Sequence, residues 1–166
     1  LTDLICQIKE TYADCALTLS VGEKSEAEYR AFREAGADRY LLRHETADKD
    51  HYRILHPEPL SLENRKHCLE TLKKIGFQTG AGFMVGSPGQ TPETLAEDFL
   101  FLKNLDPEMV GIGPFISHGD TPFRDKADGT LEDTLFYLAL LRLMHPGVLL
   151  PATTALGTIH PSGREL

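Results

Sequence analysis

The side chains of this chain that could do chemistry are concentrated in one short segment, Arg39 to Thr46. Successive side chains of a β-strand point to opposite faces, so Arg39, Arg43 and Glu45 share one face if this segment is extended. Two guanidiniums with five donors each suit a bound carboxylate or another anion. We therefore predict that this strand lines a polar, anion-binding cavity. Two alternatives stay open: a structural Arg–Glu network inside the fold, and the solvated face of an edge strand.

A second charge interrupts the apolar stripe of a predicted helix. Leu62, Leu69 and Leu72 recur at helical spacing, and Arg65 falls on the same stripe within the first helical turn. A guanidinium that reaches inward from this turn lies close to the loops that follow the strands, where it could bind a ligand carboxylate. The alternative is that the Arg65 side chain extends along the surface and reaches solvent.

The segment from Gly80 to Gln90 is rich in glycine and joins a predicted strand to a helix. Glycines on one strand face allow the backbone to approach a planar or ribose group closely, although tight packing explains them as well. Their spacing is not that of a dinucleotide-binding fingerprint. The seven histidines lack metal-ligand spacing, so we predict no metal site, and no catalytic residue can be assigned. The three cysteines form no C-x-x-C pair, which favours reduced, buried structural thiols.

Helical and strand patterns alternate along the chain. Capping signals support the helix starts: Ser25 to Glu28 reads as a capping box, and Thr91 is followed by a first-turn proline. The predicted helices cover residues 1–13, 25–35, 61–75, 91–105 and 130–144, with a short one over 48–55. The predicted strands cover residues 16–21, 39–45, 79–85, 109–115 and 148–154. Strict alternation predicts an α/β fold with a parallel sheet and right-handed crossovers.

The faces of these strands distinguish a barrel from an open doubly wound sheet. Strands buried on both sides read as continuous aliphatic runs, but here one face is aliphatic and the other is small or polar. That pattern predicts outer helices and a ligand-filled lumen, as in a TIM-type (β/α) barrel. Five strands cannot close such a barrel, and a complete one needs about 250 residues. We therefore expect residues 1–166 to form a single domain that is part of a larger barrel enzyme.

Composition excludes two classes of partner. The chain has 166 residues, 41% of them hydrophobic and 25% charged, and its formal net charge is −8. This charge, with no basic cluster, argues against a nucleic-acid partner. The apolar runs are too short for a bilayer, and no leader opens the chain. We expect a cytoplasmic protein with no membrane partner.

Four blocks of sequence resemble a known family: RYLLRHET, ENRKHCLETLKKIGFQTGAGFMVGSPGQT, MVGIGPFISHGDTPF and PATTALGTIHPSGRE. They are similar to the core of the radical S-adenosylmethionine (SAM) maturases of [FeFe]-hydrogenase, of the HydE type. Biotin synthase and methylornithine synthase are more distant relatives. The resemblance implies a (β/α) barrel holding a [4Fe–4S] cluster that binds SAM and cleaves it reductively.

The resemblance also implies roles for individual residues. Glu45 and Arg65 would hold polar groups of SAM, with Arg65 at its methionine carboxylate. By motif, Thr18 and Ser20 would lie beside SAM, and its ribose and adenine would be flanked by Met84, Gly111, Ile112 and Gly113, with the backbone as far as Phe115. The motif also implies a deeper anion site at Arg39 and Arg43. The wall of the substrate cavity would include Thr153 and Thr154.

One departure from the family bears on activity. The family holds its cluster with C-x-x-x-C-x-x-C, and nothing in this chain matches that motif. We expect the cluster thiolates to precede Leu1, so that this segment alone binds no cluster and forms no 5′-deoxyadenosyl radical. The full-length parent would act on a small molecule or a small iron complex and would need a reductant; its maturation partners stay unspecified. The alternatives are biotin synthase-like or methylornithine synthase-like chemistry, and a non-redox barrel module that binds an anionic metabolite.

Overall fold

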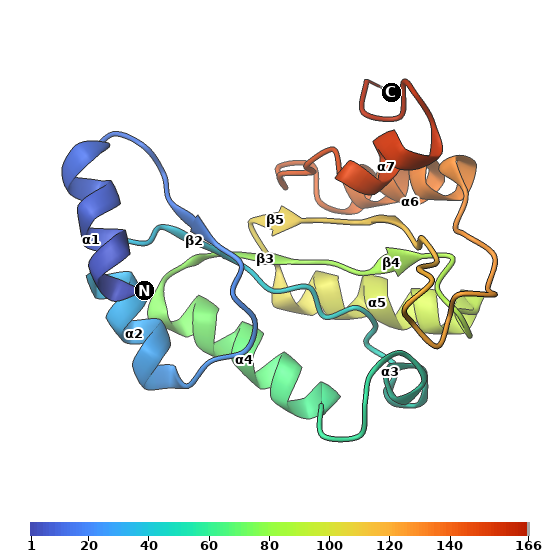
Figure 1. The fold of residues 1–166 in the computed structure, drawn as a ribbon, viewed down its shortest axis with the longest axis horizontal. Coiled ribbons are helices and arrows are strands. Elements are labelled where there is room, and N and C mark those ends of the chain that lie inside the picture. Colours follow the sequence, from blue (N-terminus) through green and yellow to red (C-terminus); the bar gives the residue numbers. More distant parts are fainter. Residues whose placement is uncertain (166) are drawn as a thin grey trace.

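The computed structural model describes residues 1–165, in which helices and parallel strands alternate (Figure 1). The helices are α1 (Thr2–Thr11), α2 (Glu26–Glu34), α3 (Lys49–Leu55), α4 (Leu62–Ile75), α5 (Pro92–Leu105), α6 (Leu131–Met144) and α7 (Thr154–Ile159). The strands are β1 (Thr18–Leu19), β2 (Arg39–Leu41), β3 (Gln78–Ala81), β4 (Met84–Val85), β5 (Met109–Val110) and β6 (Gly113–Pro114). Every predicted helix is present, with its ends within two residues of the expected ones.

The sheet is parallel throughout and open. Its order is β1-β2-β3-β5, and a second parallel ladder joins β4 to β6. β3 and β4 are two halves of one predicted strand, interrupted at Gly82, and β5 and β6 are the halves of the next. Single bridges extend the ladders, from Glu45 to Phe83 and from Met109 to Leu149. The predicted parallel arrangement is confirmed, and within residues 1–165 the sheet does not close on itself.

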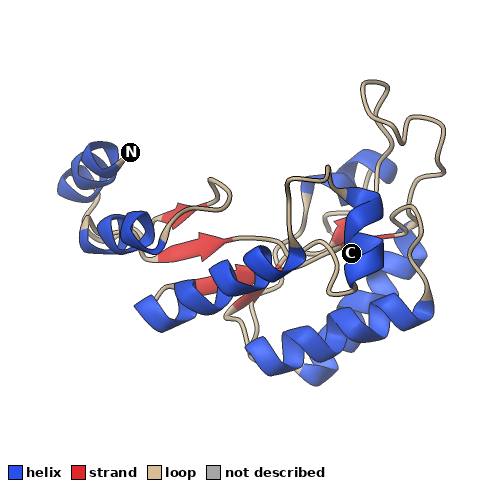
Figure 2. Ribbon diagram, turned by 90° about the horizontal axis from the view of Figure 1, so that it is seen from below, coloured by secondary structure: helices blue, strands red, loops and turns tan. Residues whose placement is uncertain are grey.

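Helix α4 shows why the helices begin and end where they do. The Ser61 side chain accepts the backbone N–H of Asn64, and the helix ends at Gly76 in the left-handed conformation with φ 95°. The capping box predicted at Ser25 is present, with Glu28 as its reciprocal partner. Helices cover the strands on one side, as the view from below in Figure 2 shows. The longest helices span 14 residues, and none among residues 1–165 has the length and apolar character of a membrane crossing.

The core lies between the sheet and these helices. Tyr40 is fully buried, and its ring meets Tyr29 and Phe77 edge-to-face at centroid distances of 5.1 Å and 5.7 Å. Leu42, two residues on, is also buried, whereas Arg43 is half-buried on the other side. The predicted alternation of buried and half-buried residues is confirmed from Arg39 to Arg43. The predicted strand over residues 39–45 is too long, because β2 ends at Leu41 and Glu45 has a φ of 66°, which is not extended. The alternation places the aliphatic face against the helices and the charged face on the opposite side of the sheet.

The predicted strand over residues 148–154 is wrong beyond its first residues. Only Leu149 forms a ladder bridge, and α7 begins at Thr154 with Thr153 as its N-cap residue. Pro151 explains the end of the strand, because proline has no backbone N–H to donate to a neighbouring strand. Thr153 and Thr154 therefore sit at a helix start rather than within a strand, and Thr154 is exposed.

Candidate functional site

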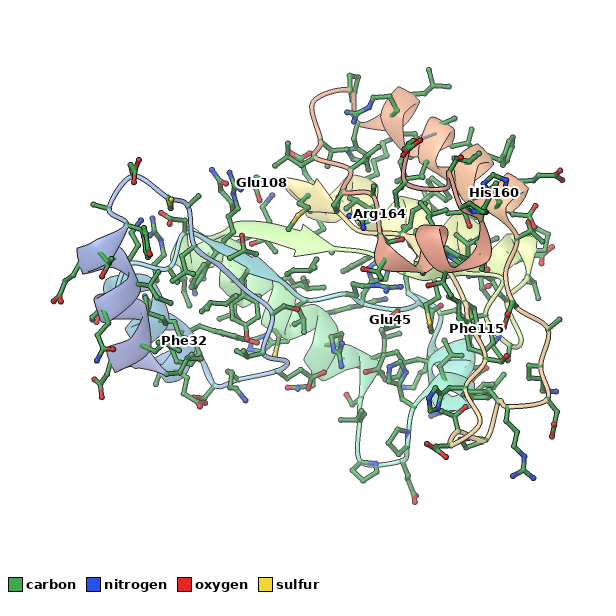
Figure 3. The ribbon with its side chains drawn as sticks, turned by 45° about the horizontal axis from the view of Figure 1, so that its top comes forward. Phe32, Glu45, Glu108, Phe115, His160 and Arg164 are labelled. Carbon is green, nitrogen blue, oxygen red and sulfur yellow. The ribbon has the colours of Figure 1, made fainter. Side chains whose placement is uncertain are left out.

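Three of the charged residues singled out above meet beyond the carboxyl end of β2. Arg43 Nη2 lies 3.1 Å from Glu45 Oε2. Arg65, in the first turn of α4, donates from Nη1 to the Arg43 carbonyl at 2.7 Å and from Nε to Glu23. Figure 3 places Glu45 in the middle of the molecule, well away from Phe32 on α2. Arg65 thus turns inward, and the alternative in which it reaches away to solvent is not what the structure shows.

Several buried polar atoms have no hydrogen-bond partner among residues 1–165. Arg43 Nε and Nη2 and Glu45 Oε2 are unsatisfied despite the ion pair between these side chains, because its geometry is not that of a hydrogen bond. The Tyr52 hydroxyl and Thr153 Oγ1 are unsatisfied as well. Folded proteins leave few buried polar atoms unpaired. Free donors and a free acceptor side by side indicate a site for a polar ligand.

The charge of Arg65 is fixed by its surroundings. Burial alone would lower the pKa of Arg65, but the hydrogen bond to Glu23 and the nearby Tyr52 and Glu45 outweigh it, so the pKa is raised. The pKa of Tyr52 is raised by burial, so its hydroxyl keeps its proton and stays a donor. Arg65 donates from Nε and once from Nη1 to protein atoms, which leaves the second N–H of Nη1 and both N–H groups of Nη2. The site therefore offers a permanent cation, as a carboxylate ligand requires.

Glu45 adopts a backbone conformation that side chains rarely take. Its φ is 66°, and Asp106 is the other non-glycine residue with a positive φ among residues 1–165. This conformation costs about 1–2 kcal/mol outside glycine. The Glu45 N–H donates to the Gly82 carbonyl at 3.0 Å, which ties the strained residue to the next strand. Strain of this kind persists where the surroundings enforce it, and such residues cluster at functional sites.

Gly82, in the turn after β3, is required for packing, and Gly80 within β3 is closely surrounded by side chains. A Cβ on Gly82, whose φ is 152°, would lie 1.9 Å from the Gly111 carbonyl oxygen. A Cβ on Gly80 would lie 2.7 Å from Met109 Cε and 2.8 Å from Leu41 Cδ1. The structure therefore supports the tight-packing interpretation at these two positions.

The residues predicted around ribose and adenine lie on β4 and from Gly111 to β6. The Met84 carbonyl already accepts Gln90 Nε2 at 2.7 Å. Ile112 is fully buried in the core. Gly113 faces Thr153, since a Cβ on Gly113 would lie 2.4 Å from Thr153 Oγ1. These residues form a narrow, side-chain-poor stretch of backbone, in which Gly111 donates its N–H to the Ala81 carbonyl at 2.9 Å.

Three other predicted residues lie in or next to the first strands of the sheet. Thr18 belongs to the edge strand β1 and Ser20 directly follows it; both are exposed, and Thr18 pairs with Arg39 at the amino end of β2. Arg39 Nε donates to Gln78 Oε1 at 2.6 Å. Arg39 also lines a cavity of about 520 Å³ formed where the strands begin. Arg39 is the first residue of β2, whereas Arg43 lies two residues beyond its last residue, Leu41, so the two guanidiniums do not belong to one site.

The sequence analysis missed Glu23 and Tyr52. Glu23 follows β1, where the carboxyl end of a parallel strand feeds the ligand side of the sheet, so its position was a usable signal. Glu23 anchors both Arg65 and Asn64, the latter at 2.5 Å. Tyr52 lies in the short helix α3 and carries no such signal, because only the fold turns its hydroxyl toward the charged cluster.

His51 joins the loops that follow β2 and β4. Its Nδ1 lies 3.1 Å from Thr46 Oγ1, and its Nε2 lies 3.2 Å from the Pro88 carbonyl and 3.3 Å from Ser87 Oγ. Because a carbonyl only accepts, the proton belongs on Nε2, and Nδ1 accepts from the threonine hydroxyl. Burial lowers the pKa of His51 in spite of the Pro88 carbonyl, which favours the protonated ring.

We expect His51 to make the protein less stable in acid. The unfolded chain binds a proton near pH 6.5 before the folded chain does, so the free energy of unfolding falls as the pH drops below about 6.5. His51→Gln should flatten this dependence between about pH 7 and pH 5. Urea unfolding at several pH values measures it, with His67→Gln on the exposed side of α4 as the matched control. Parallel pH profiles for wild type and His51→Gln would contradict the assignment.

Residues 1–165 contain no group of three or more His, Cys, Asp or Glu side chains able to hold a metal ion. The three cysteines are unpaired and scattered: Cys68 is buried, whereas Cys6 and Cys15 are exposed. The expectation that all three are buried is therefore wrong for two of them. The described chain offers no thiolate set for an iron–sulfur cluster.

Comparisons with known proteins place these observations in a family. The model of the Radical SAM superfamily matches residues 2–102. The [FeFe] hydrogenase maturase subunit HydE of Thermotoga maritima is 52% identical over 166 residues, which is all of this chain and 47% of that protein. A biotin synthase of Desulforudis audaxviator is 32% identical over 151 residues, 89% of this chain and 43% of that protein. The chain thus spans about half the length of the curated relatives that it matches.

Solved structures show the same fold. Methylornithine synthase superposes with a TM-score of 0.85 at 25% identity, over 95% of this chain and 47% of that one. The [FeFe]-hydrogenase maturase HydG superposes with a TM-score of 0.72 at 15% identity, over 90% of this chain and 37% of that one. The predicted fold class is confirmed: residues 1–165 form part of the parallel α/β barrel of these enzymes.

Proposed function

This chain belongs to the radical SAM superfamily, and from that premise we propose that it is the central to C-terminal part of the SAM-binding barrel of a hydrogenase maturase. The enzyme cleaves SAM reductively during assembly of the [FeFe]-hydrogenase active site. The identity of 52% to HydE along the whole chain supports this choice of relative. The observation that carries the proposal is the group of unsatisfied charged atoms on Arg43 and Glu45 beside Arg65.

The residues present fit SAM but not the cluster. SAM carries a carboxylate, an ammonium group and ribose hydroxyls, and this site offers free donors on Arg43 and Arg65 and a free acceptor, Glu45 Oε2. A [4Fe–4S] cluster supplies the electron for reductive cleavage, and its thiolates come from a segment other than residues 1–165. No step of the cleavage is therefore assigned to side chains of this chain.

The chain's own residues bind and orient the ligand. Arg65 binds the methionine carboxylate with a guanidinium that Glu23 and the Arg43 carbonyl hold in place. Glu45 accepts hydrogen bonds from the ammonium or hydroxyl groups. Arg43 presents positive charge deeper on the same wall, to a carboxylate or another anionic group of the substrate. Fixed donors of this kind orient a ligand without reorganising when it binds.

We propose a small molecule or small iron complex as the substrate, with a reductant that acts on the whole enzyme. Methylornithine synthase-like chemistry is the second candidate, because that enzyme superposes over 95% of this chain. Product analysis distinguishes the two, since they differ in substrate and share the cleavage of SAM.

The proposal is tested on the complete protein, reconstituted anaerobically with iron and sulfide and supplied with SAM and dithionite. We expect 5′-deoxyadenosine and methionine in equal amounts. Omission of dithionite is the control for non-reductive breakdown of SAM. A protein that carries its full iron and sulfide but forms no 5′-deoxyadenosine would contradict the proposal. That result would favour the alternative of a non-redox barrel that binds an anionic metabolite.

A further inference from the structure

A buried His–Asp pair lies behind Glu45, on the side of the sheet that faces the helices. The side chains of His44 and Asp98 are both fully buried, and His44 Nε2 lies 3.4 Å from Asp98 Oδ1. The rings of Phe83 and Phe101 flank His44 at centroid distances of 5.9 Å and 4.8 Å. Nothing in the binding role described above uses this pair, yet burying two ionisable groups is costly.

The backbone determines the protonation of His44. The Gly82 N–H donates to His44 Nδ1 at 3.3 Å, so Nδ1 carries no proton. The proton of a neutral ring is then on Nε2, which faces the carboxylate of Asp98. Asp98 Oδ1 also accepts the backbone N–H of Ala47 at 2.5 Å. Asp98 Oδ1, on α5, thus contacts both His44, which precedes Glu45, and Ala47, which follows it by two residues.

The strained residue lies between these anchors. Glu45 has φ 66° and donates its N–H to the Gly82 carbonyl at 3.0 Å. Gly82 therefore holds His44 through its N–H and Glu45 through its carbonyl. On the C-terminal side of Glu45, Asp98 holds the backbone by accepting the N–H of Ala47. Without Asp98, the segment loses the acceptor that keeps Ala47 in place, and Glu45 can relax out of the left-handed conformation.

We propose that His44 and Asp98 are positioning residues that hold the left-handed backbone of Glu45, so that its carboxylate faces the ligand. The inference rests on the proposed function, because it concerns how the same site is held. An apolar pair of similar volume would fill the space between β2 and α5 at a lower desolvation cost. It would supply no acceptor for Ala47, so filling the space is not enough to explain the carboxylate: this carboxylate also fixes the backbone beside Glu45.

The test is a double-mutant cycle on SAM affinity in the complete, reconstituted protein, measured by calorimetry without reductant so that no turnover occurs. Asp98→Leu fills the space without an acceptor, and Asp98→Asn keeps the acceptor while removing the charge. We expect Asp98→Leu to weaken SAM binding about fivefold or more, and Asp98→Asn to restore most of the affinity. In the Glu45→Ala background, Asp98→Leu should change the affinity by less than about twofold.

Phe32→Leu, in the core beside α2 and far from Glu45 in Figure 3, is the control for general destabilisation. It should lower the melting temperature without changing SAM affinity. Should Asp98→Leu not fold, His44→Asn replaces it in the cycle, because asparagine keeps an acceptor near Gly82 and loses the contact with Asp98.

Two outcomes overturn the inference, and they have different meanings. Equal losses of affinity with and without the Glu45 side chain would show that Asp98 does not act through Glu45, while the SAM site itself stands. Unchanged affinity in Glu45→Ala alone would remove Glu45 from the SAM site, and the positioning role would fall with that part of the proposed function.

Discussion

Replacing Gly82 with alanine is expected to prevent the domain from folding stably. The new Cβ would lie 1.9 Å from the Gly111 carbonyl oxygen and 2.8 Å from its carbonyl carbon. These are backbone atoms of the neighbouring strand, so no side chain can move aside. The φ of 152° also disfavours any residue with a Cβ. We expect a loss of more than about 4 kcal/mol, a large share of the about 5–15 kcal/mol that stabilises a typical domain.

Urea unfolding followed by circular dichroism measures this loss. Gly119→Ala is the matched control, because a Cβ there meets no atom within 4 Å and its backbone needs no positive φ. That variant should stay within about 0.5 kcal/mol of wild type. A Gly82→Ala protein with an unchanged unfolding midpoint would mean that the two strands do not approach as closely as described. Because Gly82 also contacts His44 and Glu45, the same substitution should disturb the ligand wall.

Removing the Arg65 guanidinium is expected to have the largest effect on SAM binding. A hydrogen bond to a charged group contributes about 1.5–3 kcal/mol, so Arg65→Ala should weaken SAM binding about 10- to 150-fold. It should also release Glu23 and the Arg43 carbonyl, both of which Arg65 holds. Arg65→Lys keeps the charge but not the planar fork, and an intermediate affinity is expected.

The experiment compares SAM affinity and 5′-deoxyadenosine formation in the complete, reconstituted protein. Arg30→Ala is the matched control, since Arg30 is exposed on α2 and pairs only with Glu26 on the same helix. Its affinity and activity should equal those of wild type. Unchanged SAM affinity together with unchanged cleavage in Arg65→Ala would remove Arg65 from the SAM site and contradict the prediction. Wild-type affinity with reduced cleavage would place Arg65 in orienting SAM rather than in binding it.

Local sequence was sufficient to predict where the helices begin and end and which faces of the strands are buried. Helix starts such as Ser61 and Thr91 follow from side chains that bond the backbone three residues on, and Gly76 ends its helix by its own conformational freedom. The alternation of Tyr40 and Leu42 with charged neighbours predicted which side of β2 faces the helices. Helix ends depend on residues within one helical turn of each other, and strand faces depend on residues two positions apart.

The end of the last strand was missed although Pro151 marks it in the sequence, and the helix that follows it has no comparable signal. Residues 148–154 have an apolar pattern that suits a strand, but pairing needs backbone donors, and Pro151 has none. The helix α7 is short, and Thr153 makes no side-chain cap bond to announce it. Its place depends on packing against β6, where Gly113 leaves room for the Thr153 hydroxyl.

By itself the sequence determined the fold class and the family, and it placed Arg43 and Glu45 in one short charged segment. The structure decided that they form an ion pair, because β2 ends at Leu41 and Glu45 leaves the extended conformation with φ 66°. The tertiary structure alone decided that Arg39 stands at the far end of β2, in a separate cavity. It also brought Glu23 to Arg65, and Asp98 to His44 and Ala47, across 42, 54 and 51 residues of chain. Contacts over such distances follow from strand register and sheet curvature, which no local pattern encodes.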